Sequence, residues 1–194
     1  MSNGHGQTTQ LTMGDLQQFE RVALAHMPSA YNLAYWIVRN RADAEDVVQD
    51  AYLRAFRAFA TCTSEDVRPW LLTIVRNVAY RWLSVRSRTA NVVSIEDALS
   101  SRHDGPELAT DQPTAEDLLI ARGDQAMVRR ALGELPSAFR EAVVLRELEG
   151  LSYQEIARVM DIPVGTVMSR LARARDQLRE RLARLMAEEN KDAL

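Results

Sequence analysis

The chain has 194 residues, of which 46% are hydrophobic, and its formal net charge at pH 7 is −3. This length allows one good-sized domain or two small ones. No apolar run approaches the roughly twenty residues that a membrane span needs, and the first residues, MSNGHGQTTQLTMGD, lack the charged-then-apolar pattern of a secretory signal. We therefore expect a cytoplasmic protein that does not insert into a membrane.

Residue types that usually carry chemistry are sparse. The single cysteine, Cys62, excludes an internal disulfide, and the histidines His5, His26 and His103 are too scattered to form a zinc site. No glycine-rich phosphate loop, Ser/His/Asp set or paired-carboxylate motif stands out. We therefore expect no cofactor, no metal and no catalysis, and we interpret Cys62 as a small residue near a helix end or in a loop.

Helical periodicity at both ends of the chain, sparse glycine and the lack of strand alternation predict an all-α fold. The middle of the chain differs, because residues 91–122 carry two arginines against seven acids and show no sustained helical period. We predict two small helical domains joined by a flexible acidic linker. The boundaries are a disordered tail at 1–15, a domain at 16–90, the linker at 91–122, a domain at 123–187 and a tail at 188–194.

In the first domain, Leu16–Val38 predicts one or two helices, interrupted or kinked around Pro28. The stretch RNRADAEDVVQDAYLRAFRAF begins the next helix, with Asp43 as its N-cap. The apolar positions predict a buried stripe, made by Val47 or Val48, Ala51, Ala55 and Phe59. The outer face carries Glu45, Asp46, Gln49 and Asp50, which are either solvated or form a docking surface for a basic partner.

The next helix covers Val67–Ala90, VRPWLLTIVRNVAYRWLSVRSRTA, with five arginines and no acid. Such a strip attracts polyanions. Its core face is predicted to hold Leu71, Ile74, Val75, Val78 and Trp82. The opposite side holds Thr73, Asn77, Tyr80 and Ser84, with Arg76 and Arg81 at its flanks. Asparagine and arginine can pair with base edges and tyrosine can stack on an unpaired base, whereas core packing is favoured for Trp70 and Trp82.

The second domain contains three predicted helices in close succession. The first follows Leu135-Pro136 and ends at Glu149-Gly150, where glycine suits a left-handed C-terminal position. Ser152 and Glu155 form an S-x-x-E capping box, which starts a short helix reaching Met160. The turn Asp161-Ile162-Pro163 leads to the third helix, starting at Gly165-Thr166. This order predicts a helix-turn-helix, whose second member enters the major groove of DNA.

The third helix begins with GTVMSRLARARDQLRER, residues 165–181, which contain five arginines and two acids. Its apolar stripe is Val167, Leu171, Ala174, Leu178 and Leu182. The opposite face carries Thr166, Ser169, Arg170, Arg173 and Gln177. Hydroxyls, guanidinium groups and an amide suit phosphates and base edges, although a solvated face has the same composition. The preceding turn favours the interpretation that this face binds DNA.

Three segments resemble, in order, the polymerase-docking, promoter-melting and helix-turn-helix segments of bacterial extracytoplasmic-function (ECF) sigma factors of the sigma-70 family. They are ADAEDVVQDAYLRAFRAF, WLLTIVRNVAYRWL and LPSAFREAVVLRELEGLSYQEIARVMDIPVGTVMSRLARARDQLRERL. The resemblance covers nearly everything from residue 16 to residue 185 except the linker. It implies two helical domains that bind core RNA polymerase and recognise the upstream and downstream promoter elements.

The resemblance also assigns roles to residues and suggests partners. Asp46, Gln49 and Asp50 would contact the β′ clamp helices of core RNA polymerase. Promoter DNA would be contacted in the downstream element by Arg76, Asn77, Tyr80 and Arg81, and in the upstream element by Thr166, Ser169, Arg170 and Arg173. The loop holding Cys62 would lie near a flipped base. An anti-sigma factor is expected as a further partner, and the linker is either a thread towards the RNA exit path or an ordinary tether.

Two positions depart from the family pattern. Asp161 stands where the family often has glycine, but aspartate tolerates a left-handed conformation at modest cost. Met168 stands where a basic residue is usual, which should remove one phosphate contact. Two rival functions are a sigma-like decoy that binds an anti-sigma protein but not promoters, and a helix-turn-helix repressor with an unrelated N-terminal domain. The basic faces argue against the decoy, and promoter binding without polymerase would identify the repressor.

Overall fold

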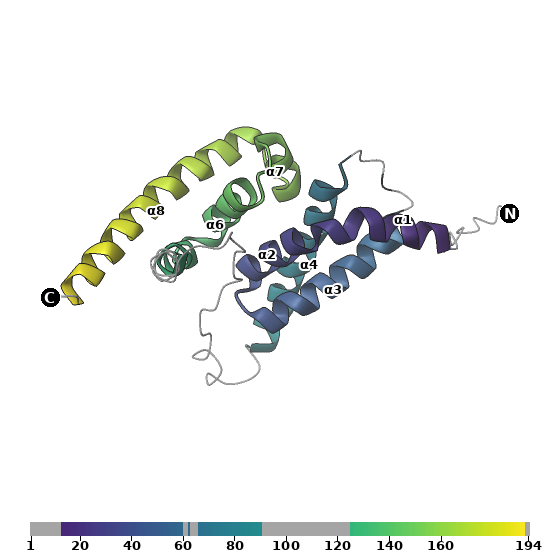
Figure 1. The fold of residues 1–194 in the computed structure, drawn as a ribbon, viewed down its shortest axis with the longest axis horizontal. Helices are drawn as coiled ribbons and strands as arrows, with labels where there is room; N and C mark the ends of the chain where they lie inside the picture. The colour runs from purple at the N-terminus through teal and green to yellow at the C-terminus, as the bar shows by residue number, and fades with distance from the viewer. Residues whose placement is uncertain (1–12, 60–61, 63–65, 91–124, 193–194) are drawn as a thin grey trace, which may run out of the picture.

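A computed structural model describes residues 13–59, 62, 66–90 and 125–192. The predicted linker and most of the predicted N-terminal tail lie outside these residues. The described residues form helices and no strand, so the predicted all-α fold is confirmed. Helices α1 to α4 gather at one end of the molecule, and α6, α7 and the long α8 gather at the other (Figure 1).

The chain enters the first domain through α1 (Met13–Ala23), the 3₁₀ turn η1 (Leu24–His26) and α2 (Met27–Val38). Pro28 lies in the first turn of α2, where its missing N–H removes no helical hydrogen bond. The predicted interruption around Pro28 is confirmed as the 3₁₀ turn before it. Arg39, at φ 62°, ends α2 in a left-handed conformation.

Helix α3 (Arg41–Ala58) begins at Asn40, whose side-chain oxygen accepts from the Asp43 N–H at 3.0 Å. The predicted N-cap at Asp43 was wrong, because Asn40 is extended and caps the helix three residues earlier. Asp43 instead places a negative charge in the first turn, where it favours the helix dipole.

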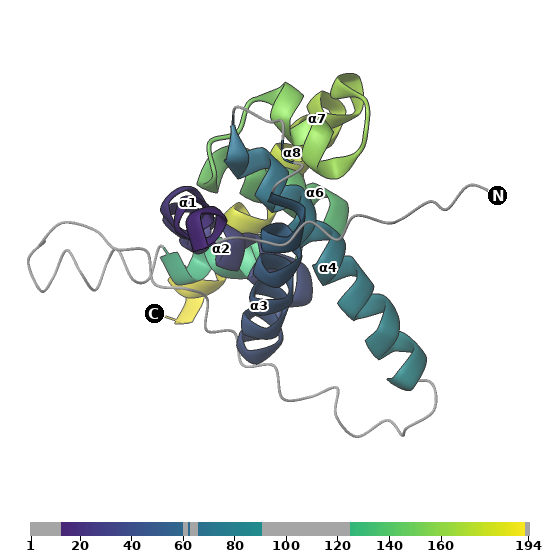
Figure 2. The ribbon, with the colours of Figure 1, turned by 90° about the vertical axis from the view of Figure 1, so that its right-hand side faces the viewer.

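Helix α4 (Val67–Ala90) crosses both α2 and α3. Its buried side includes Leu71, Val75 and Val78 as predicted, and also Leu72 and Ala79. The predicted core position of Trp82 was wrong, because this side chain keeps 36% of its surface exposed. Trp82 lies in helical phase with the buried Val78 and Ala79, so its exposure does not come from the side it faces. The C-terminal half of α4 extends beyond the neighbouring helices (Figure 2).

The second domain starts with helical residues 125–133, followed by α6 (Ser137–Val143). A π turn, η4 (Val144–Leu148), continues α6, and the Glu149 N–H donates to the Val144 carbonyl at 3.0 Å, the i to i+5 bond of a π-helix. Gly150, at φ +66°, then ends the element in the predicted left-handed conformation.

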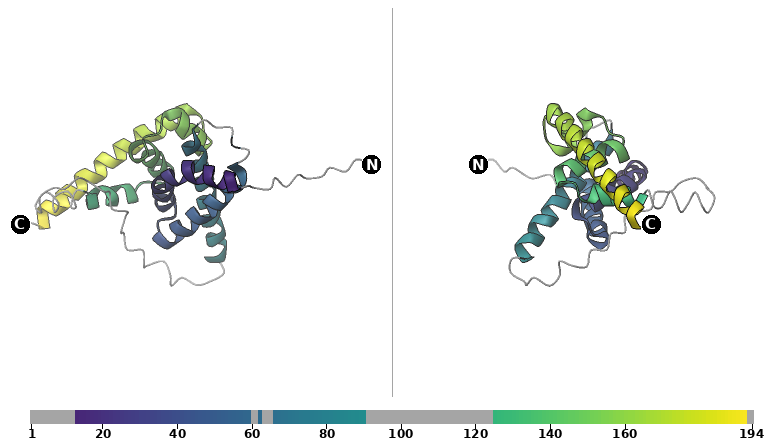
Figure 3. Two further views of the ribbon diagram at one scale, coloured as in Figure 1. Left: turned by 45° about the vertical axis from the view of Figure 1, so that its right-hand side comes forward. Right: turned by 90° about the vertical axis from the view of Figure 1, so that its left-hand side faces the viewer.

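Helix α7 (Tyr153–Met160) begins at the predicted capping box, in which Ser152 and Glu155 bond each other's backbone N–H. Asp161, at φ 52°, makes the left-handed turn before α8 (Val164–Asp192). The C-terminal half of α8 runs beside residues 125–133 (Figure 3), where Met127, Ala131 and Leu185 form a small core.

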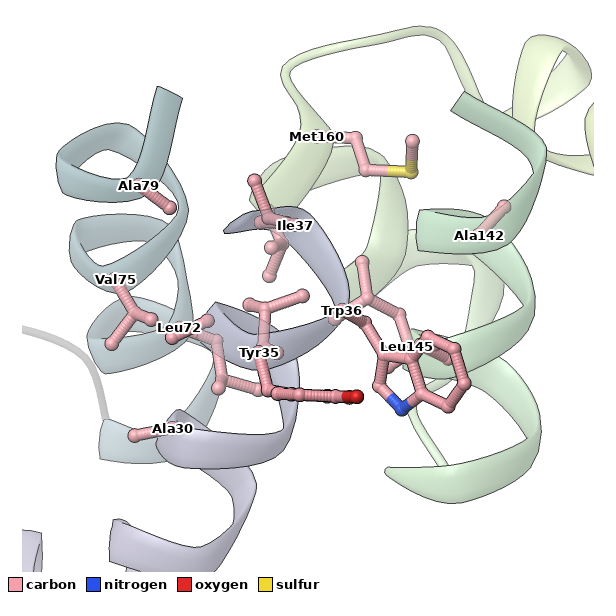
Figure 4. Packing of buried hydrophobic residues seen from close by; sticks show 14 of the residues in the cluster. Ala30, Tyr35, Trp36, Ile37, Leu72, Val75, Ala79, Ala142, Leu145 and Met160 are labelled. Carbon is pink, nitrogen blue, oxygen red and sulfur yellow. The ribbon is translucent and has the colours of Figure 1, made fainter. Parts of the chain in front are cut away.

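The two domains pack against each other through one continuous core. Helix α2 contacts α6 and η4, and α4 contacts α7. Trp36 and Ile37 of α2 lie among Leu145 and Met160 of the second domain, and all four side chains are buried (Figure 4). None of the described helices combines the length and apolarity needed to cross a membrane.

Candidate nucleic-acid interface

The outward face of α8 begins directly after a short, capped helix and a tight turn. Ile156, Val159 and Met160 bury one side of α7, and Val167 and Leu171 bury the inner side of α8. The other side of α8 is thereby held towards solvent. Ser169 and Arg173 are exposed, and Thr166 and Arg170 are partly exposed. The structure therefore brings the four predicted upstream-element residues to one end of one helix.

The arginines of α8 divide into two groups by their partners. Arg175 pairs with Glu147 at 2.8 Å and Arg179 with Asp176 at 3.0 Å. Glu134 receives Arg181 at 3.8 Å and Arg184 at 3.2 Å. Within the described part of the chain, Arg170 and Arg173 form no ion pair or hydrogen bond.

This division matters for the chemistry of the face. A guanidinium that already holds a carboxylate has part of its hydrogen-bonding capacity occupied, whereas an unpaired one keeps all five N–H donors available. Next to Arg170 and Arg173, the Ser169 hydroxyl donates to the Thr166 carbonyl at 3.0 Å and keeps its lone pairs. The first turns of α8 thus present unpaired cations and a hydroxyl, which suit phosphates and base edges.

The predicted downstream-element residues on α4 are in two different environments. Asn77 and Arg81 are exposed. Arg76 instead forms an ion pair with Glu141 of α6, and the Tyr80 hydroxyl donates to the same carboxylate at 2.7 Å. Burial, followed by the charge of Glu141, raises the pKa of Tyr80 to about 12. The second domain therefore covers half of this predicted set.

The predicted polymerase-docking residues lie on the outer side of α3. Asp46 and Gln49 are exposed. Asp50 is held by Arg54 through two hydrogen bonds of 2.9 Å, and this bonding lowers the pKa of the Asp50 carboxyl below its usual value. A basic partner would thus find Asp46 and Gln49 open but would have to compete with Arg54 for Asp50.

An apolar groove beside this face was not predicted from the sequence. It has a volume of about 1220 Å³ and lies between α1, α2 and α3, with Gln49 and two acids, Glu20 and Glu45, among its lining residues. Leu24, Met27 and Leu53 line it although 47%, 42% and 58% of their surfaces are exposed. Apolar residues at outward helical positions were the available signal, and the tertiary arrangement was needed to show that they share one groove.

Two buried charges of α6 were also missed. Glu141 is 3% exposed, and Arg140 is 9% exposed and donates to the carbonyls of Trp36, Gly133 and Leu135 at 2.9, 3.1 and 3.0 Å. Burial lowers the pKa of Arg140 from its ordinary value. The signal in the sequence was an adjacent Arg-Glu pair inside the apolar run AFREAVVL, since charges are rarely buried without partners.

Cys62 is partly exposed. Among the described residues, no three His, Cys, Asp or Glu side chains come together as a metal site would require. The loop residues that surround Cys62 lie largely outside the described residues, so its predicted place near a flipped base stays a prediction.

A helix-turn-helix whose second helix carries arginines without partners among the described residues is an arrangement typical of DNA-binding proteins. Comparison with known protein families identifies the class of protein. Sigma-70 region 2 matches residues 22–89, and sigma-70 region 4 matches residues 125–178. The chain belongs to the sigma-70 family, among its ECF sigma factors.

Individual relatives cover most of this chain. The RNA polymerase sigma-H factor of Pseudomonas aeruginosa is 34% identical over 178 residues, covering 90% of this chain and 91% of the relative. The ECF RNA polymerase sigma-E factor of Escherichia coli K12 is 31% identical over 166 residues, covering 85% and 86%.

Solved structures show the same fold. The sigma factor RpoE in complex with the anti-sigma factor NepR from Bartonella quintana aligns with a TM-score of 0.70 at 26% identity, covering 86% of this chain and 98% of that chain. CnrH in complex with the cytosolic domain of CnrY aligns with a TM-score of 0.61 at 24% identity, covering 88% and 90%.

Proposed function

We propose that the protein binds core RNA polymerase and directs it to a specific set of promoters, and that it acts in the cytoplasm without catalysing a reaction itself. The observation that carries this proposal is the pair of arginines, Arg170 and Arg173, which have no partner among the described residues and lie on the outward face of a capped helix-turn-helix. A structural role would not need unpaired cations there, because the later arginines of the same helix all find acceptors within the chain.

We assign promoter contacts to two surfaces. The upstream element is read by α8 through Thr166, Ser169, Arg170 and Arg173. The downstream element is read and opened by α4 through Arg76, Asn77, Tyr80 and Arg81. Arginine and asparagine can each make paired hydrogen bonds to base edges, and tyrosine can stack on an unpaired base, so the residue types fit duplex reading and strand separation.

We assign polymerase docking to the outer face of α3, where Asp46, Gln49 and Asp50 would meet basic groups of the β′ clamp helices. The partner that restrains the protein is proposed to be an anti-sigma factor. Support comes from the similar RpoE of Bartonella quintana, which was solved in complex with one.

The test of the whole proposal is transcription in vitro from a library of genomic fragments, with purified core polymerase and the full chain. Fragment-specific transcripts that require the chain are expected. Promoter binding by the chain alone, without any effect on polymerase, would identify a repressor instead. Polymerase binding without any selected promoter would identify a decoy.

The docking face is tested by Asp46→Arg, which reverses an exposed charge that has no partner among the described residues. We expect at least tenfold weaker binding to core polymerase, because charge complementarity across such a surface is lost. Asp50→Arg is a poorer test, since it also breaks the Asp50–Arg54 pair. Glu180→Arg, at an exposed acid of α8, is the matched control, and equal affinities of both variants in a fluorescence titration would place docking elsewhere.

A further inference from the structure

The outward surface of α8 near its first turns contains an apolar part that the assigned promoter contacts do not use. Met168 keeps 53% of its surface exposed and Val164 keeps 38%. Gly165 and Ala172 are also exposed. Residues three or four positions apart are neighbours on the surface of a helix, so these three residues are the exposed neighbours of Met168. We call the exposed apolar surface made by Val164, Gly165, Met168 and Ala172 the Met168 patch.

The Met168 patch lies directly beside the polar residues that we assign to the upstream promoter element. At about 100° per residue, Gly165 and Ala172 lie between Met168 and Ser169 around the helix axis, and Arg173 follows Ser169. The solvent-facing side of α8 is therefore divided lengthwise. One half is apolar and centred on Met168, and the other half carries a hydroxyl and a guanidinium.

Packing within the chain does not account for the Met168 patch. The Met168 side chain is more than half exposed, so it contributes little to the core. A Cβ added at Gly165 would meet no atom of the described residues within 4 Å, and the backbone there is not left-handed. Neither space nor backbone conformation thus requires glycine, although glycine destabilises a helix relative to alanine. Small residues beside an exposed methionine leave room for another molecule to approach the helix closely.

The chemistry of the Met168 patch fits one feature of DNA. In the major groove the bases present hydrogen-bond donors and acceptors, and thymine alone adds a methyl group. A methionine side chain is unbranched and polarizable, so it adapts to a small apolar group of irregular surroundings. Removing the thioether and the methyl group from water together is favourable. A methionine on this face therefore favours thymine over the other bases.

We propose that Met168 reads the methyl group of a thymine in the upstream promoter element, in a different base pair from the one that Arg173 contacts. The inference rests on the proposed function, to which it adds a specificity-determining residue. Met168 and Arg173 are five residues apart, about 7.5 Å along the helix axis. Successive bases of one DNA strand are about 3.4 Å apart, so the two side chains reach different base pairs.

The first arm of the experiment removes one methyl group at a time from the DNA. The probe is a promoter duplex obtained from the transcription experiment, in which each thymine of the upstream element is replaced in turn by deoxyuridine. Deoxyuridine lacks the methyl group and keeps every hydrogen-bonding group. With holoenzyme that contains the original chain, one of these replacements should weaken binding about fourfold, the factor expected for burying one methyl group. Fluorescence anisotropy measures the affinity.

The second arm repeats these titrations with holoenzymes that contain variants. Met168→Ala should bind the thymine duplex about fourfold more weakly than the original chain does, and deoxyuridine at the sensitive position should then have no further effect. Alanine is the best helix former, so the variant should fold normally, which circular dichroism checks. Met168→Leu, which stays apolar, should keep part of the sensitivity.

Met186→Ala is the matched control. Met186 lies on the same helix and is 52% exposed, but it is about 27 Å further along the axis than Met168. Holoenzyme with this variant should bind the thymine duplex and each deoxyuridine duplex as the original chain does. The affinity of each variant for core polymerase is measured separately, by fluorescence titration.

The outcomes separate this inference from the function on which it rests. If deoxyuridine has no effect at any position, or the same effect on the original chain and on Met168→Ala, Met168 reads no thymine. If Met168→Ala weakens only the binding to core polymerase, the Met168 patch contacts protein, and the inference is equally overturned. If holoenzyme with the original chain selects no promoter, the proposed function itself fails.

Discussion

At the scale of single residues, the arginines of α8 show that the environment of a side chain matters more than its type. Composition alone makes all of them candidates for DNA binding. The structure pairs Arg175, Arg179, Arg181 and Arg184 with acceptors within the chain, whereas Arg170 and Arg173 have no partner in residues 13–59, 62, 66–90 and 125–192. Of the arginines of α8, Arg170 and Arg173 are therefore the two that could bind DNA without first breaking a described contact within the chain.

We predict that Arg173→Ala weakens recognition of the upstream element by roughly 1–3 kcal/mol and relaxes base preference at one position, as expected for a residue that contacts a guanine. Arg170→Ala should weaken binding to all sequences alike and flatten the salt dependence, as expected for a phosphate contact. The measurement is promoter binding by holoenzyme at two salt concentrations against single-base variants.

Arg184→Ala is the control for this series. Arg184 makes an exposed ion pair with Glu134 at 3.2 Å, and such pairs contribute about 0–1 kcal/mol to stability. It should leave binding and salt dependence nearly unchanged. Equal effects of all three substitutions would mean that the arginines act as diffuse charge and that no single position reads a base.

At the scale of single elements, the capping box fixes where α7 begins and therefore how the turn presents α8. Ser152→Ala removes the acceptor for the Glu155 N–H, which lies at 3.3 Å. We predict that the free energy of unfolding falls by about 1 kcal/mol, the usual cost of losing such a cap. Urea denaturation measures the change, and Ser84→Ala, on the exposed side of α4, should alter stability far less.

The same capping box gives an acid dependence. Hydrogen bonds from Ser152 lower the pKa of Glu155 below its ordinary value of 4.5. A carboxyl with a lowered pKa stabilises the folded state above its unfolded pKa, and this contribution is lost as the pH falls through the folded value. The effect of Ser152→Ala should therefore shrink when the denaturation is repeated below pH 4, and a constant difference would show that Glu155 does not contribute.

Local signals made most elements predictable. The capping box, Gly150 as a helix end and the left-handed Asp161 each depend on a few neighbouring residues, and the structure agrees with all three. Two local predictions failed. Asn40 caps α3 before Asp43 can do so. Trp82 keeps 36% of its surface exposed although helical phase places it between the buried Val78 and Ala79.

The site was less predictable than the elements. The face of α8 follows from helical phase, so Ser169 and Arg173 lie where the sequence predicted them. The partners of Arg76 and Tyr80 could not be predicted, since Glu141 lies more than sixty residues away along the chain. The sequence would be the same whether or not the two domains were packed together. A sequence pattern indicates which side of a helix is polar, but it does not identify what covers that side.

At the scale of the whole molecule, two partly buried tyrosines predict instability in alkali. Burial raises the pKa of Tyr52 and of Tyr80 to about 12 from the ordinary value of 10.0. Between these values the unfolded state releases protons that the folded state keeps, so stability should fall as the pH rises from about 10 to about 12. The measurement is urea denaturation at a series of alkaline pH values.

The two tyrosines should differ in what their ionisation disrupts. Tyr52 donates to the Ala23 carbonyl within the first domain, at 2.9 Å, whereas Tyr80 donates to Glu141 across the domain interface. Tyr80→Phe should therefore reduce the alkaline change in domain separation, and Tyr52→Phe should reduce only the loss of folding stability. If domain separation and folding stability changed in the same way with alkaline pH in both variants, the ionisation of Tyr80 would have no effect on the domain interface.

Because of the π turn η4, the contacts of Glu141 and Glu149 with the first domain should tolerate the deletion of one residue. Glu141 and Glu149 are eight positions apart, which in a regular α-helix would leave them about 80° apart around the axis. Both nevertheless meet partners in the first domain, because the wider turn at Val144–Leu148 takes up one additional residue. If one residue were deleted here, Glu141 and Glu149 would be seven positions apart in an unbroken α-helix. Their directions around the helix axis would then differ by only about 20°. Deletions in this segment should therefore be accepted, whereas a deletion in α7, which has no such turn, would rotate the residues that follow by a full 100°.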